Sequence, residues 1–308
     1  MENQNFRFRL LMAAVIGFAG LISCEKVIDI SVPDKERKIV VNGLISPEKP
    51  VRINLSKSLS ILDIDSIIAI KGSNVNLFHG NDLIGKLLED SGGFYSLPGF
   101  IPEVGESYRL TAAVNGMQSI EAEAVLPPVV PLISADTATL TTQWGSQELR
   151  VTLKFQDPAG DKNIYGFGVA VTVKEFDYAT MTYTGHKVTR NSYLYKSSQG
   201  PVKDEFHNFE GKLYCDDLLF NGLTKSVEFG VSDYSFFESD TVWLTVKMEQ
   251  IDPSYYLYAI SNEEYQNAHG NPFSEPVQVF TNVKGGYGVF AGSSVVNFPL
   301  VITGMRKF

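Results

Sequence analysis

The chain has 308 residues, a formal net charge of −9 and 44% hydrophobic residues. A chain this acidic has no electrostatic basis for binding nucleic acid or anionic lipid headgroups, because both carry negative charge. We therefore expect no nucleic-acid partner. The hydrophobic fraction is ordinary for a globular protein, and the length favours two domains over one.

A short apolar segment near the N-terminus ends at a cysteine. Arg7 and Arg9 precede an apolar core at residues 10–19, and this core is shorter than the ~20 residues that a membrane-spanning helix needs. The core leads into Leu21-Ile22-Ser23-Cys24, with a leucine three positions before the cysteine and a small residue directly before it. The pattern predicts a lipoprotein signal peptide over residues 1–23 and lipidation of Cys24. A signal peptide with an incidental, unmodified cysteine is the alternative.

Residues 24–37 are rich in charged side chains and predict a lipidated tether rather than a strand. Several acyl chains on one cysteine anchor a protein stably, whereas a single chain holds only weakly. Cleavage removes Glu2, Arg7 and Arg9, so the net charge of the mature chain is −10. We expect a lipid anchor in a membrane. The acidic residues after Cys24 resemble a surface-export signal, which slightly favours the cell surface over the periplasmic face.

Short alternating segments predict a β-sandwich, Ig-like or transthyretin-like, over residues 38–126. Val51, Ile53 and Leu55 alternate with polar residues, as in a half-buried strand. His79-Gly80-Asn81-Asp82 and Asn115-Gly116 predict two hairpin turns. Three prolines in residues 127–131 cannot donate hydrogen bonds to a β-ladder, and we place a domain boundary after residue 126.

Residues 127–308 predict a second β-rich, sandwich-like domain with one inserted helix. Asp252 is a good N-cap and Pro253 a good first residue, so we expect a helix at about 253–268. The overall fold class is mainly β. Apolar alternation predicts the strands of this domain at residues 149–155, 165–176, 181–195, 227–231, 242–246, 277–283, 289–291 and 295–302.

Two groups of residues resemble a known family. Val40-Val41-Asn42-Gly43-Leu44-Ile45 resembles its N-terminal pattern, and Asn271-Pro272-Phe273-Ser274-Glu275-Pro276-Val277 with Asn282-Val283-Lys284-Gly285-Gly286-Tyr287-Gly288-Val289-Phe290 resembles its C-terminal signature. The family is that of Bacteroidota outer-membrane lipoproteins known as domain-of-unknown-function family 4249. The resemblance covers nearly the whole mature chain. It implies an accessory lipoprotein of the kind that often accompanies TonB-dependent receptors, and it carries over no catalytic residues.

We interpret the signature positions as structural. The glycines would permit positive φ angles or the close passage of another strand, with Phe273, Tyr287 and Phe290 packed around them. An aromatic-rimmed binding loop is the alternative. The signature positions are Asn271, Pro272, Phe273, Glu275, Pro276, Asn282, Gly285, Gly286, Gly288 and Phe290.

No group of residues has a pattern typical of catalysis. The segment 286–291 fits a loose dinucleotide-binding pattern, but a strand-like segment follows where that motif requires a helix. Asp157, Asp161 and Asn163 lack the spacing of an EF-hand loop and indicate a plain turn. Cys215 is expected to be a small buried apolar residue. None of the four histidines, His79, His186, His207 and His269, stands at metal-ligand spacing from another histidine or a cysteine.

We therefore expect no catalytic, cofactor or metal site. The sequence predicts a non-catalytic accessory or ligand-binding module that works with a TonB-dependent receptor. A stand-alone adhesin or glycan-binding lipoprotein is the alternative, and a hydrolase assembled from distant residues is the least favoured function. Four tyrosines could supply a contact surface, since the ring gives area and the hydroxyl a polar tip: Tyr178, Tyr183, Tyr193 and Tyr195.

Overall fold

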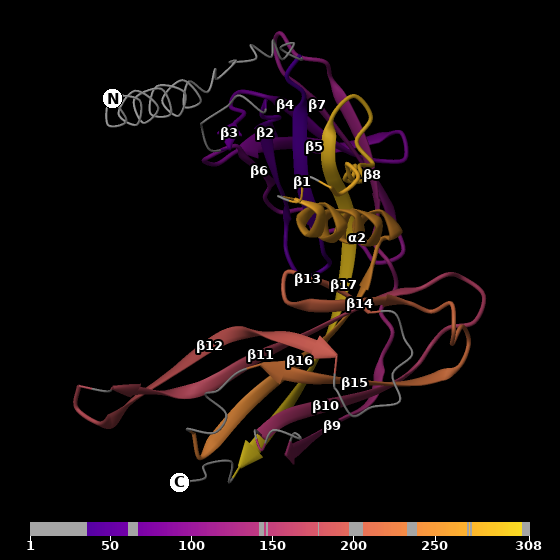
Figure 1. Cartoon of the computed structure of the whole chain (residues 1–308). Coiled ribbons are helices and arrows are strands. Elements are labelled where there is room, and N and C mark those ends of the chain that lie inside the picture. The colour runs from indigo at the N-terminus through magenta and orange to yellow at the C-terminus, as the bar shows by residue number, and fades with distance from the viewer. Residues whose placement is uncertain are drawn as a thin grey trace, which may run out of the picture. The chain divides into compact units, whose positions relative to one another are not determined.

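The computed structural model describes residues 36–60, 67–141, 145, 147–177, 179–196, 206–232, 239–269, 271 and 273–303. Seventeen strands and one helix make up this part of the chain (Figure 1), which confirms the mainly β fold class. The predicted signal peptide, Cys24 and most of the tether lie outside the described residues. The helix in the described part is neither long nor apolar enough to cross a bilayer.

The first eight strands enclose one cluster of buried side chains. Val51, Ile53 and Leu55 are buried there, as predicted. Both predicted hairpins are confirmed: one pairs His79 with Asp82, and the other turns at Gly116, whose φ is +77°. The strands are β1 (Ile39–Ile45), β2 (Val51–Lys57), β3 (Ile68–Ala69), β4 (Asn74–His79), β5 (Asp82–Glu89), β6 (Phe94–Leu97), β7 (Ser107–Ala113) and β8 (Ile120–Val125).

The next eight strands enclose a second cluster, in which Phe155, Tyr165, Phe167 and Phe229 are fully buried. One layer pairs in the order β9-β10-β15-β12, and β11 pairs with β12, β14 and β16. Cys215 is 2% exposed within this cluster, so its prediction as a buried apolar residue is confirmed. The strands are β9 (Leu132–Thr141), β10 (Gln147–Gln156), β11 (Ile164–Asp177), β12 (Thr182–Lys196), β13 (His207–Phe209), β14 (Lys212–Asp216), β15 (Thr224–Ser232) and β16 (Thr241–Ile251).

The predicted helix is confirmed as α2 (Pro253–Ala268). The Asp252 side chain accepts a hydrogen bond from the backbone N–H of Ser254 at 2.7 Å, and proline occupies the first turn. Tyr256 and Ala259 are buried in a small third cluster against β13 and β14. The residues that start this helix are neighbours along the chain, so sequence analysis could predict where the helix begins.

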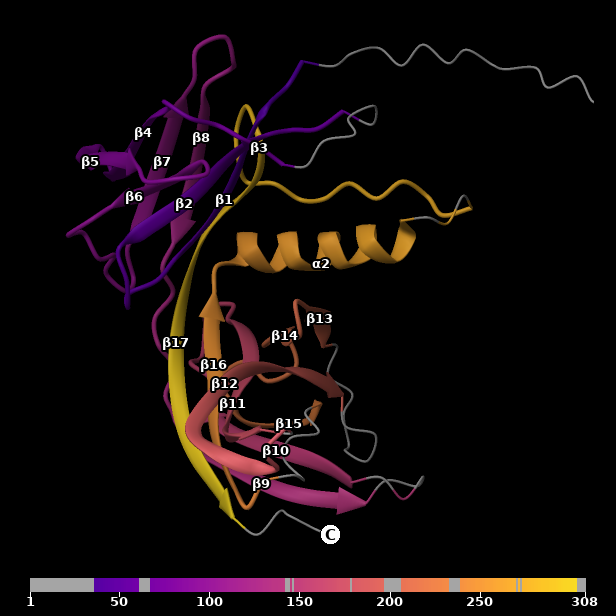
Figure 2. The same cartoon turned by 90° about the vertical axis from the view of Figure 1, so that its left-hand side faces the viewer.

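The final strand, β17 (Tyr287–Thr303), runs along both groups of strands (Figure 2). Its residues 287–292 pair in parallel with β1, and its residues 293–303 pair antiparallel with β16. The prediction of separate strands at 289–291 and 295–302 is therefore wrong, because one continuous strand changes partner at residues 292–293. The strand predicted at 277–283 is also wrong: that segment has no ladder partner, and side chains at its end bond to β17 instead.

The residues Arg37–Phe308 form one compact unit. Two hydrogen bonds tie the proline-rich segment to later strands: the Val130 N–H donates to Gln250 Oε1 at 2.8 Å, and Ser294 Oγ donates to the Pro127 carbonyl at 2.6 Å. Val283 and Phe290, from the predicted second domain, lie in the cluster that β1–β8 enclose. The domain boundary after residue 126 stays a prediction. The strand β17 pairs with strands on both sides of this boundary.

Candidate functional site

The first half of the family signature lies just after α2. Asn271, Glu275 and Pro276 are exposed, and Phe273 is 94% exposed, whereas Pro272 lies outside the described residues. From here the chain runs back along α2 (Figure 2), where the Phe280 N–H donates to Ser261 Oγ at 2.8 Å. A helix of 16 residues measures about 24 Å. The expectation that Phe273 packs beside the signature glycines is therefore wrong, because the two lie toward opposite ends of this helix.

The second half of the signature forms a corner that holds β17 in place. Asn282 Nδ2 donates to the Phe290 carbonyl at 2.7 Å, and Asn282 Oδ1 accepts from the Phe290 N–H at 3.1 Å. The same Nδ2 donates to the Glu123 carbonyl in β8 at 2.9 Å. Thr281 Oγ1 donates to the Gly288 carbonyl at 2.7 Å. The Asn282 side chain thus binds both the N–H and the carbonyl of Phe290, as the backbone of a neighbouring strand would. The Phe290 side chain itself is fully buried.

The glycines of this corner lie against backbone atoms of other strands. A Cβ at Gly286 would lie 2.4 Å from the Ile39 carbonyl oxygen, and one at Gly285 would lie 2.7 Å from the Ser119 carbonyl oxygen. At Gly288 the corresponding distance to the Val41 carbonyl oxygen is 2.0 Å, and its φ is +90°. No side chain fits at such distances, so the glycines allow the corner to lie directly on β1 and the β7–β8 turn.

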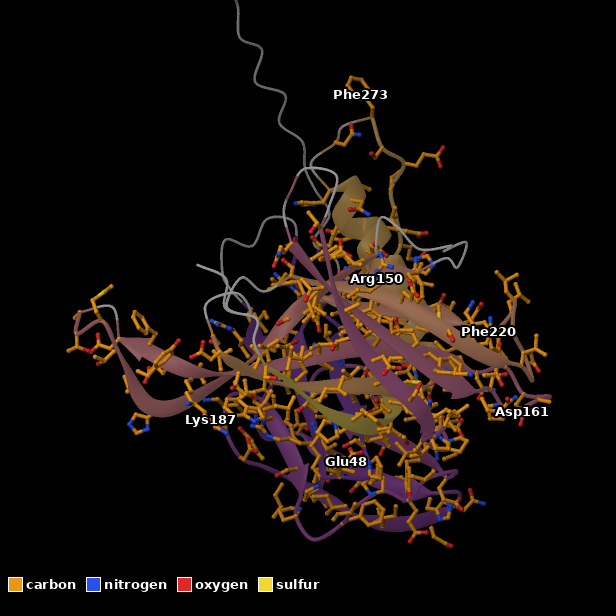
Figure 3. All side chains as sticks on the ribbon, turned by 90° about the horizontal axis from the view of Figure 1, so that it is seen from below. Glu48, Arg150, Asp161, Lys187, Phe220 and Phe273 are labelled. Atoms are coloured by element: carbon orange, nitrogen blue, oxygen red, sulfur yellow. The ribbon has the colours of Figure 1, made fainter. Side chains whose placement is uncertain are left out.

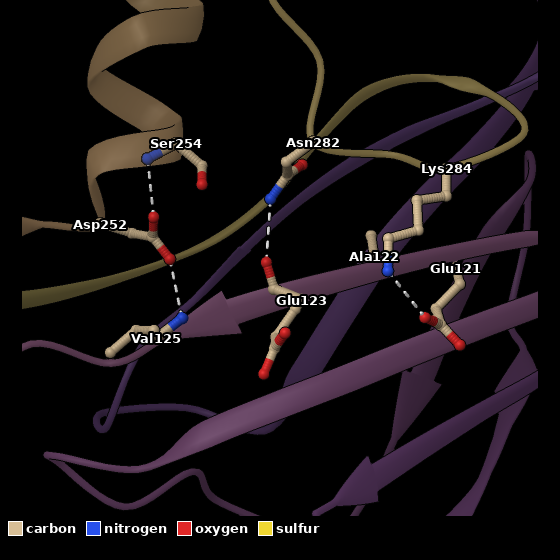
Figure 4. A pocket seen from close by; sticks show the side chains of 8 residues that line it. All are labelled: Glu121, Ala122, Glu123, Val125, Asp252, Ser254, Asn282 and Lys284. Atoms are coloured by element: carbon tan, nitrogen blue, oxygen red, sulfur yellow. Dashed lines mark hydrogen bonds and ion pairs between the residues drawn. The ribbon is translucent and has the colours of Figure 1, made fainter.

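A small cavity of about 290 Å³ opens where this corner, β8 and the start of α2 meet (Figure 4). Asp252 is 3% exposed, and its two carboxylate oxygens accept from the backbone N–H groups of Ser254 and Val125, both at 2.7 Å. At the open side, Lys284 Nζ lies 3.4 Å from Glu121 Oε1, and the lysine is 83% exposed. An ion pair this exposed contributes little to stability.

The chemistry of this cavity is that of a joint between elements. Both oxygens of Asp252 are engaged by backbone donors, so this carboxylate links the start of α2 to the end of β8. The Asp252 backbone N–H also donates to the Gly292 carbonyl at 2.9 Å, which adds β17 to the same joint. The sequence identified Asp252 as a helix cap but held no signal for its bond to Val125, which is 127 residues away.

A comparison with protein families bears on this corner. The family model described as Domain of unknown function (DUF4249) matches residues 25–298, which include the whole joint. The chain belongs to this family. A comparison with curated proteins finds no match. Within the DUF4249 match, the second half of the signature thus coincides with the segment that fixes β17 to β1 and β8.

The remaining sequence candidates lie apart from one another. Among the described residues, no three His, Cys, Asp or Glu side chains gather at metal-binding geometry. His79 Nε2 lies 2.8 Å from Glu106, and His207 Nδ1 lies 3.5 Å from Glu263 on α2. The four histidines lie at the end of β4 (His79), in β12 (His186), in β13 (His207) and after α2 (His269).

A larger groove, of about 540 Å³, lies on β1, β2 and β6. The Arg52 guanidinium carbon lies 3.9 Å from the centre of the Phe94 ring, and Arg52 Nε donates to Asp90 at 3.0 Å. Hydrogen bonding to Arg52 lowers the pKa of the Asp90 carboxyl from its ordinary value. The arginine thus covers the aromatic surface that a sugar ring would otherwise stack on.

Of the four tyrosines considered as a contact surface, two pack on glycines, one in the β13–β14 turn and one in β15. The Tyr193 ring lies over Gly211 and is 70% exposed, and the Tyr195 ring lies over Gly230 and is 37% exposed. Tyr183 is paired within the β11–β12 hairpin, and Tyr178 lies outside the described residues.

A different tyrosine cluster lies between α2 and β14. Burial raises the pKa of Tyr214, Tyr255 and Tyr258, and nearby Glu210 adds to the shift. Tyr214 and Tyr255 also share a hydrogen bond. These hydroxyls stay protonated at neutral pH, so they pack and donate rather than exchange protons.

Replacing Gly288 with alanine should destabilise the protein by about 3–5 kcal/mol, because the new Cβ meets the Val41 carbonyl and the backbone has positive φ. Gly116→Ala is the matched control: its φ is +77°, but nothing lies within 4 Å of its added Cβ. The control should lose only the backbone term, about 1 kcal/mol. Urea unfolding of both variants measures the difference, and equal losses would contradict the close contact with β1.

The tyrosine cluster predicts a loss of stability in alkali. Above about pH 10 the tyrosines of the unfolded chain ionise, whereas the folded state keeps Tyr214 and Tyr255 protonated because burial raises their pKa. The unfolded chain then binds fewer protons, so the free energy of unfolding falls as pH rises. Tyr214→Phe should flatten that fall, and Tyr193→Phe, at a 70% exposed ring, should leave it unchanged. Chemical unfolding between pH 8 and pH 11 tests both, and identical slopes in the two variants would disprove the assignment.

Proposed function

We propose that this protein is a lipid-anchored lipoprotein of the outer membrane, whose β-rich body is a non-catalytic binding module that works beside a TonB-dependent receptor. The observation that carries the proposal is Leu21-Ile22-Ser23-Cys24 at the end of a short apolar leader. Membership of the DUF4249 family supports it, through the resemblance that the signature residues carry.

The tether after Cys24 would limit how far the β-rich body can move from the membrane. Twelve residues, 25–36, separate Cys24 from the compact unit that begins at Arg37. A chain of that length reaches at most about 45 Å when fully extended. Acylation of Cys24 would therefore keep the body within this distance of the bilayer and raise its effective concentration near membrane partners without any new contact.

The polar groups of the two cavities are engaged by other groups of the chain itself, which supports a non-catalytic role. Asp252 and Asn282 hold backbone groups of neighbouring elements, and Arg52 is held by Asp90 above Phe94. A catalytic role would require a nucleophile, a base and an oxyanion site around one reacting atom. The covered Phe94 ring also gives the glycan-binding alternative less support than a protein-binding role.

Lipidation is tested by mass spectrometry of the mature protein from its natural host. We expect a chain that starts at Cys24 and carries acyl chains on that residue. Cys24→Ala should move the protein from the membrane to the soluble fraction or leave the leader uncleaved. Cys215→Ala is the matched control and should remain in the membrane, because this buried side chain lies in the core.

A receptor partnership is tested separately with the detergent-extracted, C-terminally tagged lipoprotein. Co-purification of a TonB-dependent receptor in near-stoichiometric amount is the expected result.

The two tests have separate contradicting outcomes. A mature start at another residue, or an unmodified leader, would contradict the lipid anchor at Cys24. Lipidated protein that purifies without a receptor would contradict the partnership alone.

A further inference from the structure

The end of the body at which the tether joins it carries exposed apolar side chains. Leu59 is 47% exposed, Ile67 is 75% exposed and Ile68 is 38% exposed. Leu59 lies just after β2, Ile67 lies just before β3, and Ile68 is the first residue of β3. Residues 61–66, between them in sequence, lie outside the described residues. We call Leu59, Ile67 and Ile68 the tether-end patch. Exposed apolar groups that lie together mark sites of contact with proteins or membranes.

Strand pairing places the patch beside the first residue of the compact unit. Lys57 in β2 pairs with Ile39 in β1 on one side and with Ile68 in β3 on the other. One residue beyond Lys57, the Ser58 carbonyl accepts from the Arg37 guanidinium at 3.1 Å. The compact unit begins at Arg37, and the described chain starts beside β3 (Figure 2). The tether therefore joins the body directly next to the patch.

A tyrosine from a fourth strand lies at the same end of the body. Tyr287 is the first residue of β17, pairs with Val40 of β1 and is 45% exposed. Lys38 Nζ lies 5.0 Å from the centre of its ring. Tyrosine is enriched where a membrane meets water, because its ring is apolar and its hydroxyl is polar. The end formed by β3, β2, β1 and the start of β17 thus presents aliphatic side chains with a tyrosine nearby.

The length of the tether indicates which end of the body stays near a bilayer. The chain from Cys24 to Arg37 reaches at most about 45 Å. β17 starts at the end that holds the patch and runs to the opposite end of the body (Figure 2). Its 17 residues measure about 56 Å along the strand. Because the tether is shorter than β17, a lipid on Cys24 would hold the Arg37 end nearer the membrane than the end at Thr303.

Other exposed apolar side chains do not share this position. Phe273 projects by itself from the loop after α2 (Figure 3), toward the end of the helix that lies away from β17. Leu223 lies just before β15, and Val301 lies near the end of β17. The tether-end patch is thus the exposed apolar group, among these, that lies where the tether joins the body.

The charges near the patch neither attract nor repel lipid headgroups strongly. Residues 57–71 hold two lysines and two aspartates, Lys57, Asp63, Asp65 and Lys71, whose formal charges sum to zero. The affinity of an interfacial segment for lipid scales with the apolar area that it buries, plus any electrostatic attraction. Contact with lipid would therefore depend on the apolar side chains here. A tether raises the effective concentration at the bilayer, so even a small apolar area can stay bound.

We propose that the tether-end patch inserts into the lipid bilayer to which Cys24 is anchored, so that the body stands on the end formed by β1, β2, β3 and the start of β17. The bilayer removes Leu59, Ile67 and Ile68 from water, and the Tyr287 hydroxyl lies at the level of the headgroups. The second group of strands then points away from the membrane. The proposal rests on the proposed lipid anchor and adds to it which end of the body contacts lipid.

The test uses the full lipoprotein from its natural host, reconstituted in phosphatidylcholine vesicles whose acyl chains carry a nitroxide quencher. A fluorophore is attached through Ile67→Cys. Val301→Cys is the matched control, because Val301 is 61% exposed near the other end of β17. Cys215 is 2% exposed, so the added cysteine is the one that reacts. We expect the nitroxide to quench the label at position 67 roughly fivefold more strongly than the label at position 301, in low and in high salt alike.

A second substitution tests the apolar contact itself, with the label kept at position 67. Leu59→Asp should reduce the quenching several-fold, whereas Leu223→Asp, at an exposed leucine before β15, should leave it unchanged. Both variants should keep the wild-type thermal midpoint, because the substituted side chains are exposed.

The outcomes separate this proposal from the lipid anchor. Equal quenching at positions 67 and 301, or quenching that Leu59→Asp does not change, would overturn the proposal and leave the anchor intact. A label at position 67 that the nitroxide does not reach, but that a co-purified receptor shields from aqueous iodide, would assign the patch to a protein and also overturn it. A chain that does not float with the vesicles would contradict the anchor and, with it, this proposal.

Discussion

The structure depends on one strand that belongs to both groups of sheets. β17 leaves β1 at Gly292, where an added Cβ would lie 2.1 Å from the Val125 carbonyl oxygen at the end of β8. At the same point, the Asp252 N–H donates to the Gly292 carbonyl, and its carboxylate accepts from the Val125 N–H. The end of β8, the start of α2 and the change of partner in β17 are thus fixed by one residue and one close backbone contact.

The second half of the signature lies in this joint and forms a corner. Asn282 supplies hydrogen bonds that a neighbouring strand would otherwise supply, and Gly288 allows β17 to lie directly on β1. These demands concern backbone geometry, and at Gly288 they leave no room for a side chain.

Sequence analysis correctly predicted the elements whose geometry depends on residues close together along the chain. The start of α2 follows from an aspartate cap and a proline in the first turn, and the two hairpins follow from glycine at their turns. It failed for β17 because both partners of this strand, β1 and β16, lie far from it along the chain. Phe273 was misplaced because the chain between it and the signature glycines runs back along α2, which leaves this side chain 94% exposed.

The most direct test of a shared β17 uses Trp243 in β16 as the reporter, in a Trp144→Phe background that leaves one tryptophan. Leu110 on β7 is fully buried in the other cluster, and Leu110→Ala should cost about 2–5 kcal/mol. If β17 couples the two groups of strands, this distant substitution lowers the free energy of urea unfolding reported by Trp243 fluorescence by that amount. A Trp243 transition unchanged by Leu110→Ala would show that the two groups unfold independently and would contradict the account.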